Sequence, residues 1–365
     1  MSKYGLEVGT PDIKSVGSIT FGPEGILFIA DNVSAEVFAI DVGDSGSLGE
    51  TRPVDVDHLD ARLAAFLGCD RRDVVIRDMA VHPTSQNVYL SVMRGRGVDA
   101  AAAIIRVERD GSVAEVSLSD VAFSQTDISD APAEDDERVD GRIVLGVDEG
   151  EEFEYSGVKL RLTRERLRTS TVTDMAWVDG LLLVAGASNE EFSSTLRRIP
   201  FPFSGDLVSN SLEIYHVSHG MYETASPIRT FVPYGGNTSV LASYTCTPVV
   251  HFSLTDLQGG AQAKGRTVAE LGSMNQPLGM VSYVRDGEEY LLVSNTRHPL
   301  IKIACSDIDG QDGLHEPKEP IGVPRTNLAP EGVSRMANLN GSHVLMMQRD
   351  AEGDIHLKSY STASL

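Results

Sequence analysis

Short apolar runs separated by tight polar turns recur along the whole chain. The runs are rich in Val, Ile and Leu and come in pairs, each joined by a turn that contains Gly, Pro or Asn. This pattern is typical of β-hairpins, whereas the 3.6-residue periodicity of amphipathic helices is nearly absent. The predicted hairpins pair residues 18–21 with 26–30, 79–81 with 88–92, 175–178 with 181–185, 230–232 with 239–243, 280–284 with 289–293, and 333–337 with 343–347.

A third strand follows each hairpin, at residues 36–40, 103–107, 195–199, 248–252, 300–304 and 355–360. Fourth strands are expected after most of them, for example at 212–216 and 267–271. A four-stranded unit that repeats about every 50 to 60 residues predicts an all-β fold, a six-bladed β-propeller that forms a single domain over residues 1–365. A two-sheet sandwich is the alternative, but it does not need so many strands. We expect a strand near residues 4–8 to complete the last blade and close the ring.

The longest connections between the predicted blades fall on one face. In a propeller the first strand of each blade starts at one end of the channel, and the connections between blades lie at that end, which we call the mouth face. They include a helix expected at 57–67 and ended by Gly68, an insertion at about 119–172 with the acidic run A-E-D-D-E-R-V-D, and the Gly- and Pro-rich stretch 306–330. Because binding residues concentrate on loops held by a rigid scaffold, we expect the mouth face to carry the function.

Acidic residues recur at the start of the innermost strands. Asp78 in R-D-M-A-V and Asp174 in T-D-M-A-W share one position, and Glu331 in A-P-E-G-V is expected at the equivalent point of the last blade. Loops between second and third strands add Asn32 and Asn295. Carboxylate and amide oxygens that converge in this way predict a hard-cation site of the calcium type. The alternative is that each Asp accepts hydrogen bonds from backbone amides of the adjacent blade and each Asn serves its own turn.

Strand-initial D-M-A, together with a Glu that opens another blade, resembles the six-bladed propellers of the regucalcin and gluconolactonase, paraoxonase and strictosidine synthase class. That resemblance implies one divalent ion at the channel mouth, with Glu331, Asp78 and Asp174 in the ligand positions, and hydrolysis of a lactone or ester. The longer runs N-E-E-F-S-S-T-L-R-R-I-P-F-P-F and Y-T-C-T-P resemble a bacterial propeller family with no assigned function.

Two loops of the predicted mouth face carry residues suited to catalysis. The stretch S-H-G-M-Y-E contains His219, a candidate general base because imidazole titrates near neutrality, and Glu223. The stretch Y-T-C-T-P contains Tyr244 and Cys246, and the thiol is a candidate nucleophile or a soft metal ligand together with His219 or His298. The alternatives are a surface His that caps a turn and a Cys that acts as a small buried hydrophobe.

Arginines are also frequent near the predicted mouth of the channel. Their guanidinium groups predict an anionic or carboxylate substrate, and Asn189 in S-N-E-E is expected beside them. Neutralisation of nearby Asp and Glu is the alternative role. The candidate substrate-binding residues are Arg94, Arg96, Asn189, Arg229 and Arg297.

The composition narrows the function further. A net charge of -22 argues against nucleic acid and against anionic lipid surfaces. Three Cys without a C-x-x-C pair indicate neither a disulfide framework nor a zinc knuckle, and no apolar stretch is long enough to span a membrane. Without a signal peptide, we expect a soluble cytoplasmic protein, a monomer or small homo-oligomer, that acts on a small molecule. A non-catalytic binding propeller and a Cys/His redox or copper site are the alternative functions.

Overall fold

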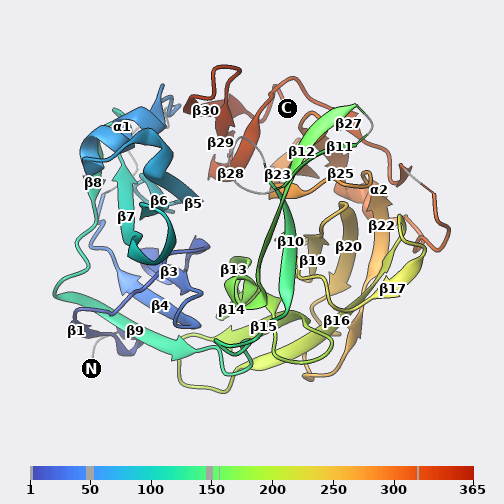
Figure 1. Ribbon diagram of the computed structural model, residues 1–365, viewed down its shortest axis with the longest axis horizontal. Helices are drawn as coiled ribbons and strands as arrows, with labels where there is room; N and C mark the ends of the chain where they lie inside the picture. The colour runs from blue at the N-terminus through green and yellow to red at the C-terminus, as the bar shows by residue number, and fades with distance from the viewer. Residues whose placement is uncertain (1–2, 47–52, 145–150, 156, 319) are drawn as a thin grey trace.

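The chain folds into sheets that are arranged around a central axis, as the computed structural model in Figure 1 shows. The structure describes residues 3–46, 53–144, 151–155, 157–318 and 320–365. These residues form seven sheets, in which almost all neighbouring strands are antiparallel. The all-β propeller class that the sequence predicts is confirmed.

Six of the seven sheets begin at an innermost strand beside the axis. These strands are β2 (Ile19–Phe21), β5 (Val74–Val81), β13 (Asp174–Val178), β18 (Thr230–Tyr234), β23 (Pro277–Arg285) and β28 (Val333–Asn340). They contact one another in a closed ring in the order β5, β2, β13, β18, β23, β28. The first two sheets of the sequence are therefore exchanged in space, as Figure 1 also shows.

The outer strands complete each sheet. Outside β2 lie β3 (Ile26–Asp31), β4 (Glu36–Asp41), β9 (Val121–Asp127) and β1 (Glu7–Gly9), and outside β5 lie β6 (Val88–Arg94), β7 (Ala101–Val107) and β8 (Val113–Glu115). Outside β13 lie β14 (Leu181–Ala187), β15 (Ser194–Pro200), β16 (Val208–His216) and β17 (Met221–Glu223), with β21 (Ala263–Lys264) parallel to β16.

The other three sheets are smaller. Outside β18 lie β19 (Ser239–Ser243), β20 (Pro248–Ser253), β22 (Arg266–Glu270) and β26 (Ile321–Gly322), outside β23 lie β24 (Glu288–Asn295), β25 (Ile301–Ala304) and β27 (Thr326–Asn327), and outside β28 lie β29 (His343–Arg349) and β30 (Ile355–Ser361). The ring sheets thus contain three to six strands in the described residues, and the expectation of four strands in each blade is wrong.

Apolar side chains fill the spaces between neighbouring sheets. Every residue of β3 is buried, because both faces of this strand are covered by adjacent sheets. Leu27 and Ile29 of β3 pack with Tyr89 and Ile104 of the neighbouring sheet in one such cluster. This explains why the strands have nearly continuous Val, Ile and Leu runs rather than a strict alternation of apolar and polar residues.

Two long-range pairings determine how the ring is closed. The chain forms β5–β8 and then returns, so that β9 pairs with β4. Val56 bridges to Leu357 of the last ring sheet, and each residue donates its amide to the other's carbonyl over 2.9 Å. The expected closure by residues 4–8 is wrong, because β1 pairs with β9. The expected insertion at 119–172 is also shorter, since β9 belongs to a ring sheet.

Val56→Pro tests this closure. Proline removes the amide that Leu357 accepts, and it also replaces a side chain that is only 2% exposed. We expect the free energy of unfolding to fall by about 3 kcal/mol, as measured by urea denaturation. Val8→Pro, on the outer strand β1, is the control and should cost clearly less. Equal losses in the two variants would contradict the assigned closure.

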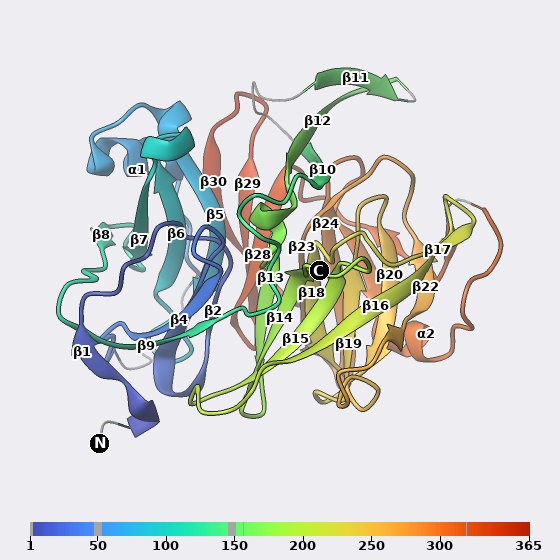
Figure 2. The same cartoon turned by 60° about the horizontal axis from the view of Figure 1, so that its bottom comes forward.

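The seventh sheet stands above the ring. It contains β10 (Val139–Val144), β12 (Val158–Arg166) and β11 (Glu151–Tyr155), and Figure 2 shows it on the same side as α1 (Leu59–Leu67). Helix α1 ends at Gly68, which has φ 65°, as the sequence predicts. The remaining helices are α2 (Cys305–Asp309) and the single 3-10 turns Lys3–Gly5, Pro23–Gly25, Arg71–Asp73, Gly97–Asp99 and Leu167–Ser170. None of the helices in the described residues has the length and hydropathy needed to cross a bilayer.

Candidate functional site

The starts of the innermost strands line a cavity of about 1710 Å³ at the axis, which we call the axial cavity. The seventh sheet borders the same cavity through Arg142 and Ile143 of β10 and Thr163 and Glu165 of β12. Of the residues predicted from the sequence to form a site, the cavity lining includes Asn32, Asp78, Arg96, Asp174 and Arg229.

One position on each innermost strand, or just before it, faces this cavity. The six residues at this position, which we call the axial ring, are Ser18, Asp78, Asp174, Thr230, Gly279 and Arg335. In each case the next residue is buried and apolar: Ile19, Met79, Met175, Phe231, Met280 and Met336. Each buried apolar residue fixes the register of its innermost strand, because side chains alternate between the two faces of a strand. The preceding residue therefore faces the axis.

The carboxylates of the axial ring join neighbouring innermost strands. Asp78 Oδ2 accepts the Ile19 amide over 2.9 Å and the Ser18 hydroxyl over 3.0 Å. Asp174 Oδ2 accepts the Phe231 amide over 2.9 Å. Each carboxylate therefore binds a backbone N–H of the adjacent sheet, which is the structural role that the sequence left open as an alternative.

Asp174 has an unusual electrostatic environment. Burial and, secondly, the negative charge of Asp78 raise the pKa of Asp174 to about 7. Burial also raises the pKa of Asp78, but Arg335 opposes this shift, with its Nε at 3.9 Å from Asp78 Oδ1. The axial ring thus combines a fixed cation with a carboxyl group that titrates near neutrality.

The expected position of Glu331 is wrong. Its side chain is exposed and lies outside the cavity lining. The stretch S-R-M-A-N aligns with R-D-M-A-V and T-D-M-A-W, so that Arg335 occupies the position of Asp78 and Asp174. Sequence reasoning missed Arg335 because it looked for a third carboxylate instead of extending the M-A repeat.

The two asparagines of the predicted cation site have other partners. Asn32 reaches across to the next sheet, where its amide donates to the Val172 carbonyl over 2.9 Å and accepts the Val172 amide over 2.8 Å. Asn295 Oδ1 accepts the amides of Arg297 and His298 in its own loop. Both side chains stabilise the backbone instead of facing an ion.

The axial cavity therefore does not fit a calcium ion. Calcium takes six to eight oxygen ligands, about 2.3–2.6 Å away. The axial ring offers two carboxylates that already accept backbone amides, and the guanidinium of Arg335 lies beside one of them. The ligand set implied by the resemblance to the regucalcin class does not assemble among the described residues.

Arg335 is held rigidly. Its Nε and Nη2 donate to the Arg77 carbonyl over 3.1 and 2.9 Å, and its Nη1 donates to the carbonyls of Leu278 and Ser334 over 2.9 and 2.8 Å. These contacts leave one N–H of the guanidinium, and the side chain is 32% exposed. Arg335 therefore presents a fixed positive charge to the cavity.

Arg229 lines the cavity but holds the seventh sheet. Its guanidinium pairs with both oxygens of Asp140 in β10, and both side chains are 5% exposed. Although burial opposes it, the hydrogen bonds and charge of Arg229 lower the pKa of Asp140 to about 2. Arg229 thus anchors β10 to the start of β18 by neutralising Asp140, which is the alternative role that the sequence left open for these arginines.

The remaining predicted substrate-binding residues are dispersed. Arg96 lines the cavity and donates to the Arg72 carbonyl over 3.0 Å, whereas Arg94 and Asn189 are exposed and lie outside the lining. Arg297 lies outside the lining too, and its guanidinium stacks over the Tyr155 ring of β11 with 4.8 Å to the ring centroid. The structure does not bring these four residues together.

The predicted catalytic residues lie outside the axial cavity. Tyr244 is fully buried in an apolar cluster, and burial raises the pKa of its hydroxyl. His219, Glu223 and Cys246 lie together between two sheets, with His216 beside them.

No protein-family model matches the chain, and no curated protein matches it. Solved structures resemble it at the level of fold. The β-propeller domain of Cps50 (Swd1) from Myceliophteria thermophila has 9% identity and a TM-score of 0.41, with 95% of this chain and 83% of that chain covered. U3-55K has 9% identity, a TM-score of 0.39 and coverages of 97% and 98%. Streptogramin B lyase has 10% identity, a TM-score of 0.30 and coverages of 98% and 97%.

These neighbours include a propeller enzyme and propellers that are not named as enzymes. At such low identity they say nothing about a reaction or a ligand. The axial cavity and its charges are the basis for a functional proposal.

Proposed function

We propose that the axial cavity binds a small anionic molecule and hydrolyses a lactone or ester bond in it, with Asp174 as the general base. The observation that carries this proposal is the axial ring, in which Arg335 supplies a fixed cation and Asp174 has a pKa of about 7. A general base works best when its pKa lies near the working pH.

The charge of the cavity lining favours an anion. Eight arginines and five carboxylates line the axial cavity, although the whole chain has a net charge of -22. Two of these arginines, Arg71 and Arg229, also pair with Asp354 and Asp140, which lie outside the lining, so the local excess of positive charge is small. A local excess of positive charge in an acidic protein concentrates anions in the cavity. Arg72, Arg77, Arg96, Arg335 and Arg349 come from the two adjacent sheets that start at β5 and β28, so this side of the cavity is the expected binding site for the anionic group.

The geometry of the ring suggests how the groups cooperate. Along the ring order, Asp174 is three strands away from Arg335 in either direction, so the two residues face each other across the axis. Gly279, beside Arg335 in the axial ring, also lines the cavity and presents no side chain to it. A molecule between them would place its carbonyl oxygen toward Arg335 and an attacking water toward Asp174.

The reaction follows from these positions. Ionised Asp174 takes a proton from the water as the water oxygen bonds to the carbonyl carbon, and the remaining N–H of Arg335 stabilises the negative oxygen that forms. The C–O bond of the lactone or ester then breaks, and the leaving alkoxide receives the proton from Asp174. The products are a carboxylic acid and an alcohol.

Arg335→Gln tests the binding step. We expect the affinity for small carboxylates, measured by calorimetry across a panel of mono- and dicarboxylates, to fall by about tenfold or more. Arg94→Gln removes an exposed arginine outside the cavity and should leave the affinity unchanged. If the wild type binds no member of the panel, or if both variants bind like the wild type, the proposed anion site is wrong.

The hydrolytic step is tested with a panel of lactones and esters. Asp174→Asn should abolish turnover while binding persists, because asparagine cannot take the proton. Binding without any turnover in the wild type would instead favour a non-catalytic binding propeller.

A further inference from the structure

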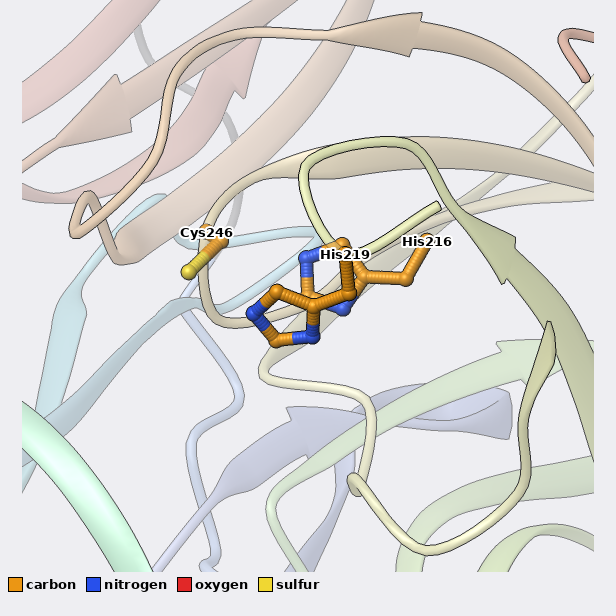
Figure 3. Close-up of side chains that lie close together, drawn as sticks. All are labelled: His216, His219 and Cys246. Atoms are coloured by element: carbon orange, nitrogen blue, oxygen red, sulfur yellow. The ribbon is translucent and has the colours of Figure 1, made fainter. Parts of the chain in front are cut away.

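A second cluster of chemically active side chains lies away from the axial cavity. It contains His216 at the end of β16, His219 in the following turn and Cys246 in the loop between β19 and β20. Figure 3 shows these three side chains close together. One ligand atom from each residue lies within 4.8 Å of the others.

The two imidazoles are oriented by one carboxylate. Glu223 Oε2 lies 2.7 Å from Nδ1 of His216, and Glu223 Oε1 contacts Nδ1 of His219. A carboxylate accepts hydrogen bonds, so Nδ1 of each ring carries a proton, and in the neutral imidazole Nε2 then keeps a lone pair that can bind a metal. Metal-bound histidines typically donate the N–H of the other ring nitrogen to a carboxylate, which fixes the tautomer in this way.

An unsatisfied atom points to a missing partner. His216 is 3% exposed, and its Nε2 is buried without a hydrogen-bond partner in the described residues. A buried polar atom without a partner costs about 1–3 kcal/mol, so native proteins rarely keep one without a function. A metal ion would take up the lone pair of this atom.

The backbone around Cys246 is also unusual. Cys246 and Thr247 have φ values of 64° and 53°, and this left-handed conformation is rare for a non-glycine residue and rarer for a β-branched one. Such strain persists where the surrounding structure enforces it, and it concentrates at functional sites. Cys246 is 5% exposed, and its Sγ accepts the Met274 amide over 3.4 Å.

From this arrangement we infer that His216, His219 and Cys246 bind a divalent transition metal ion of the zinc type. Two imidazoles and one thiolate are ligands that a borderline-soft ion prefers, and three protein ligands leave a fourth position open. The charges also balance, because the thiolate and Glu223 together offset a divalent ion. The side chain of His219 is 47% exposed, which leaves solvent access on its side.

The inferred metal site is independent of the proposed function at the axis. None of its four residues lines the axial cavity. Its ligands come from the sheet that starts at β13 and from the one that starts at β18, so a bound ion would cross-link two neighbouring sheets. An ion that binds only the folded state raises the stability of that state.

The test uses the purified full chain after treatment with a chelator. We expect calorimetry to show about one Zn²⁺ per chain and the melting temperature to rise on addition of Zn²⁺. With Co²⁺ as a spectroscopic probe, we expect a thiolate-to-metal charge-transfer band, because cysteine becomes a direct ligand.

Matched variants identify the ligands. Cys246→Ser should remove the charge-transfer band, and His219→Ala and Glu223→Gln should each weaken Zn²⁺ binding by about 10–100-fold. Cys69→Ser and His343→Ala, which lie outside the cluster, should bind like the wild type. His219 is exposed enough that its loss should not prevent folding. Failure of the wild type to bind Zn²⁺, or equally tight binding by Cys246→Ser and His219→Ala, would overturn the inference.

Discussion

Arg229→Met is expected to lower the free energy of unfolding by about 3–5 kcal/mol. The substitution leaves Asp140 without its main partner at a place where both side chains are 5% exposed. A buried carboxylate has lost its hydration, and without the ion pair it has too few favourable interactions to offset that loss. Arg142 Nε, at 3.2 Å, and the Ser170 hydroxyl, at 2.5 Å, still contact Asp140, so the loss should lie near the lower end of this range.

A second variant separates loss of the charge pair from loss of packing. In Arg229→Met/Asp140→Leu both charges are absent, and most of the stability should return. Arg94→Met, on the surface, should change stability by less than about 0.5 kcal/mol. Urea denaturation measures all three variants. A loss below about 1 kcal/mol in Arg229→Met would show that the pair does not stabilise the fold.

The Arg229–Asp140 pair also predicts a pH effect. The folded-state pKa of Asp140 is lowered to about 2 from an ordinary value of 3.8. Its stabilising contribution is therefore complete above about pH 4 and is lost as the pH falls toward 2. Because Asp140 lies in β10, the seventh sheet should become sensitive to limited proteolysis in Arg229→Met before the ring sheets do.

The positions of the strands were largely predictable, because the strands and the turns between them depend on residues that are close together in the sequence. The turn between β13 and β14 is an example, since Asp179 and Gly180 have φ values of 46° and 90°, which a two-residue hairpin turn requires. The run D-M-A predicted that Asp78 and Asp174 share one position, and in the structure both line the axial cavity and accept a backbone amide of the adjacent sheet.

The order of the sheets could not be predicted, because it depends on pairings between distant segments. Nothing in the local pattern near Val56 indicates that it joins Leu357, and nothing near β9 indicates that it returns to β4. The pattern of apolar residues predicts where a strand lies in the sequence. It does not predict which sheet edge that strand pairs with, because any open edge offers unpaired backbone N–H and C=O groups.

The site was only partly predictable for a related reason. Residue type suggested that His219 and Cys246 have chemical roles, but their contact with His216 depends on how two sheets meet. Glu331 was predicted at the axis because of its negative charge. The stretch S-R-M-A-N, aligned with R-D-M-A-V and T-D-M-A-W, instead places Arg335 at that position. At the axis, register decides which side chain faces the cavity.

Asp174→Asn should remove a pH dependence of stability that the wild type shows between about pH 4 and pH 7. In the folded protein the pKa of Asp174 is raised from 3.8 to about 7. The folded state therefore holds the proton more tightly than the unfolded state, so stability is highest at low pH and falls as the pH rises through this interval. Burial of the ionised carboxylate near Asp78 opposes folding above pH 7, by an amount on the order of a few kcal/mol.

Asparagine cannot ionise, but it offers only one acceptor where Asp174 accepts the amides of Met175 and Phe231. At pH 5 we therefore expect Asp174→Asn to be less stable than the wild type by about 1–3 kcal/mol. At pH 8 the wild type contains the ionised carboxylate, so the difference should shrink or reverse. Urea denaturation at pH 5, 6, 7 and 8 measures this crossover, with Asp286→Asn, whose side chain is 92% exposed, as the control. Parallel pH profiles of the wild type and Asp174→Asn would show that Asp174 is ionised throughout this range, and the proposed general base would then lack its near-neutral pKa.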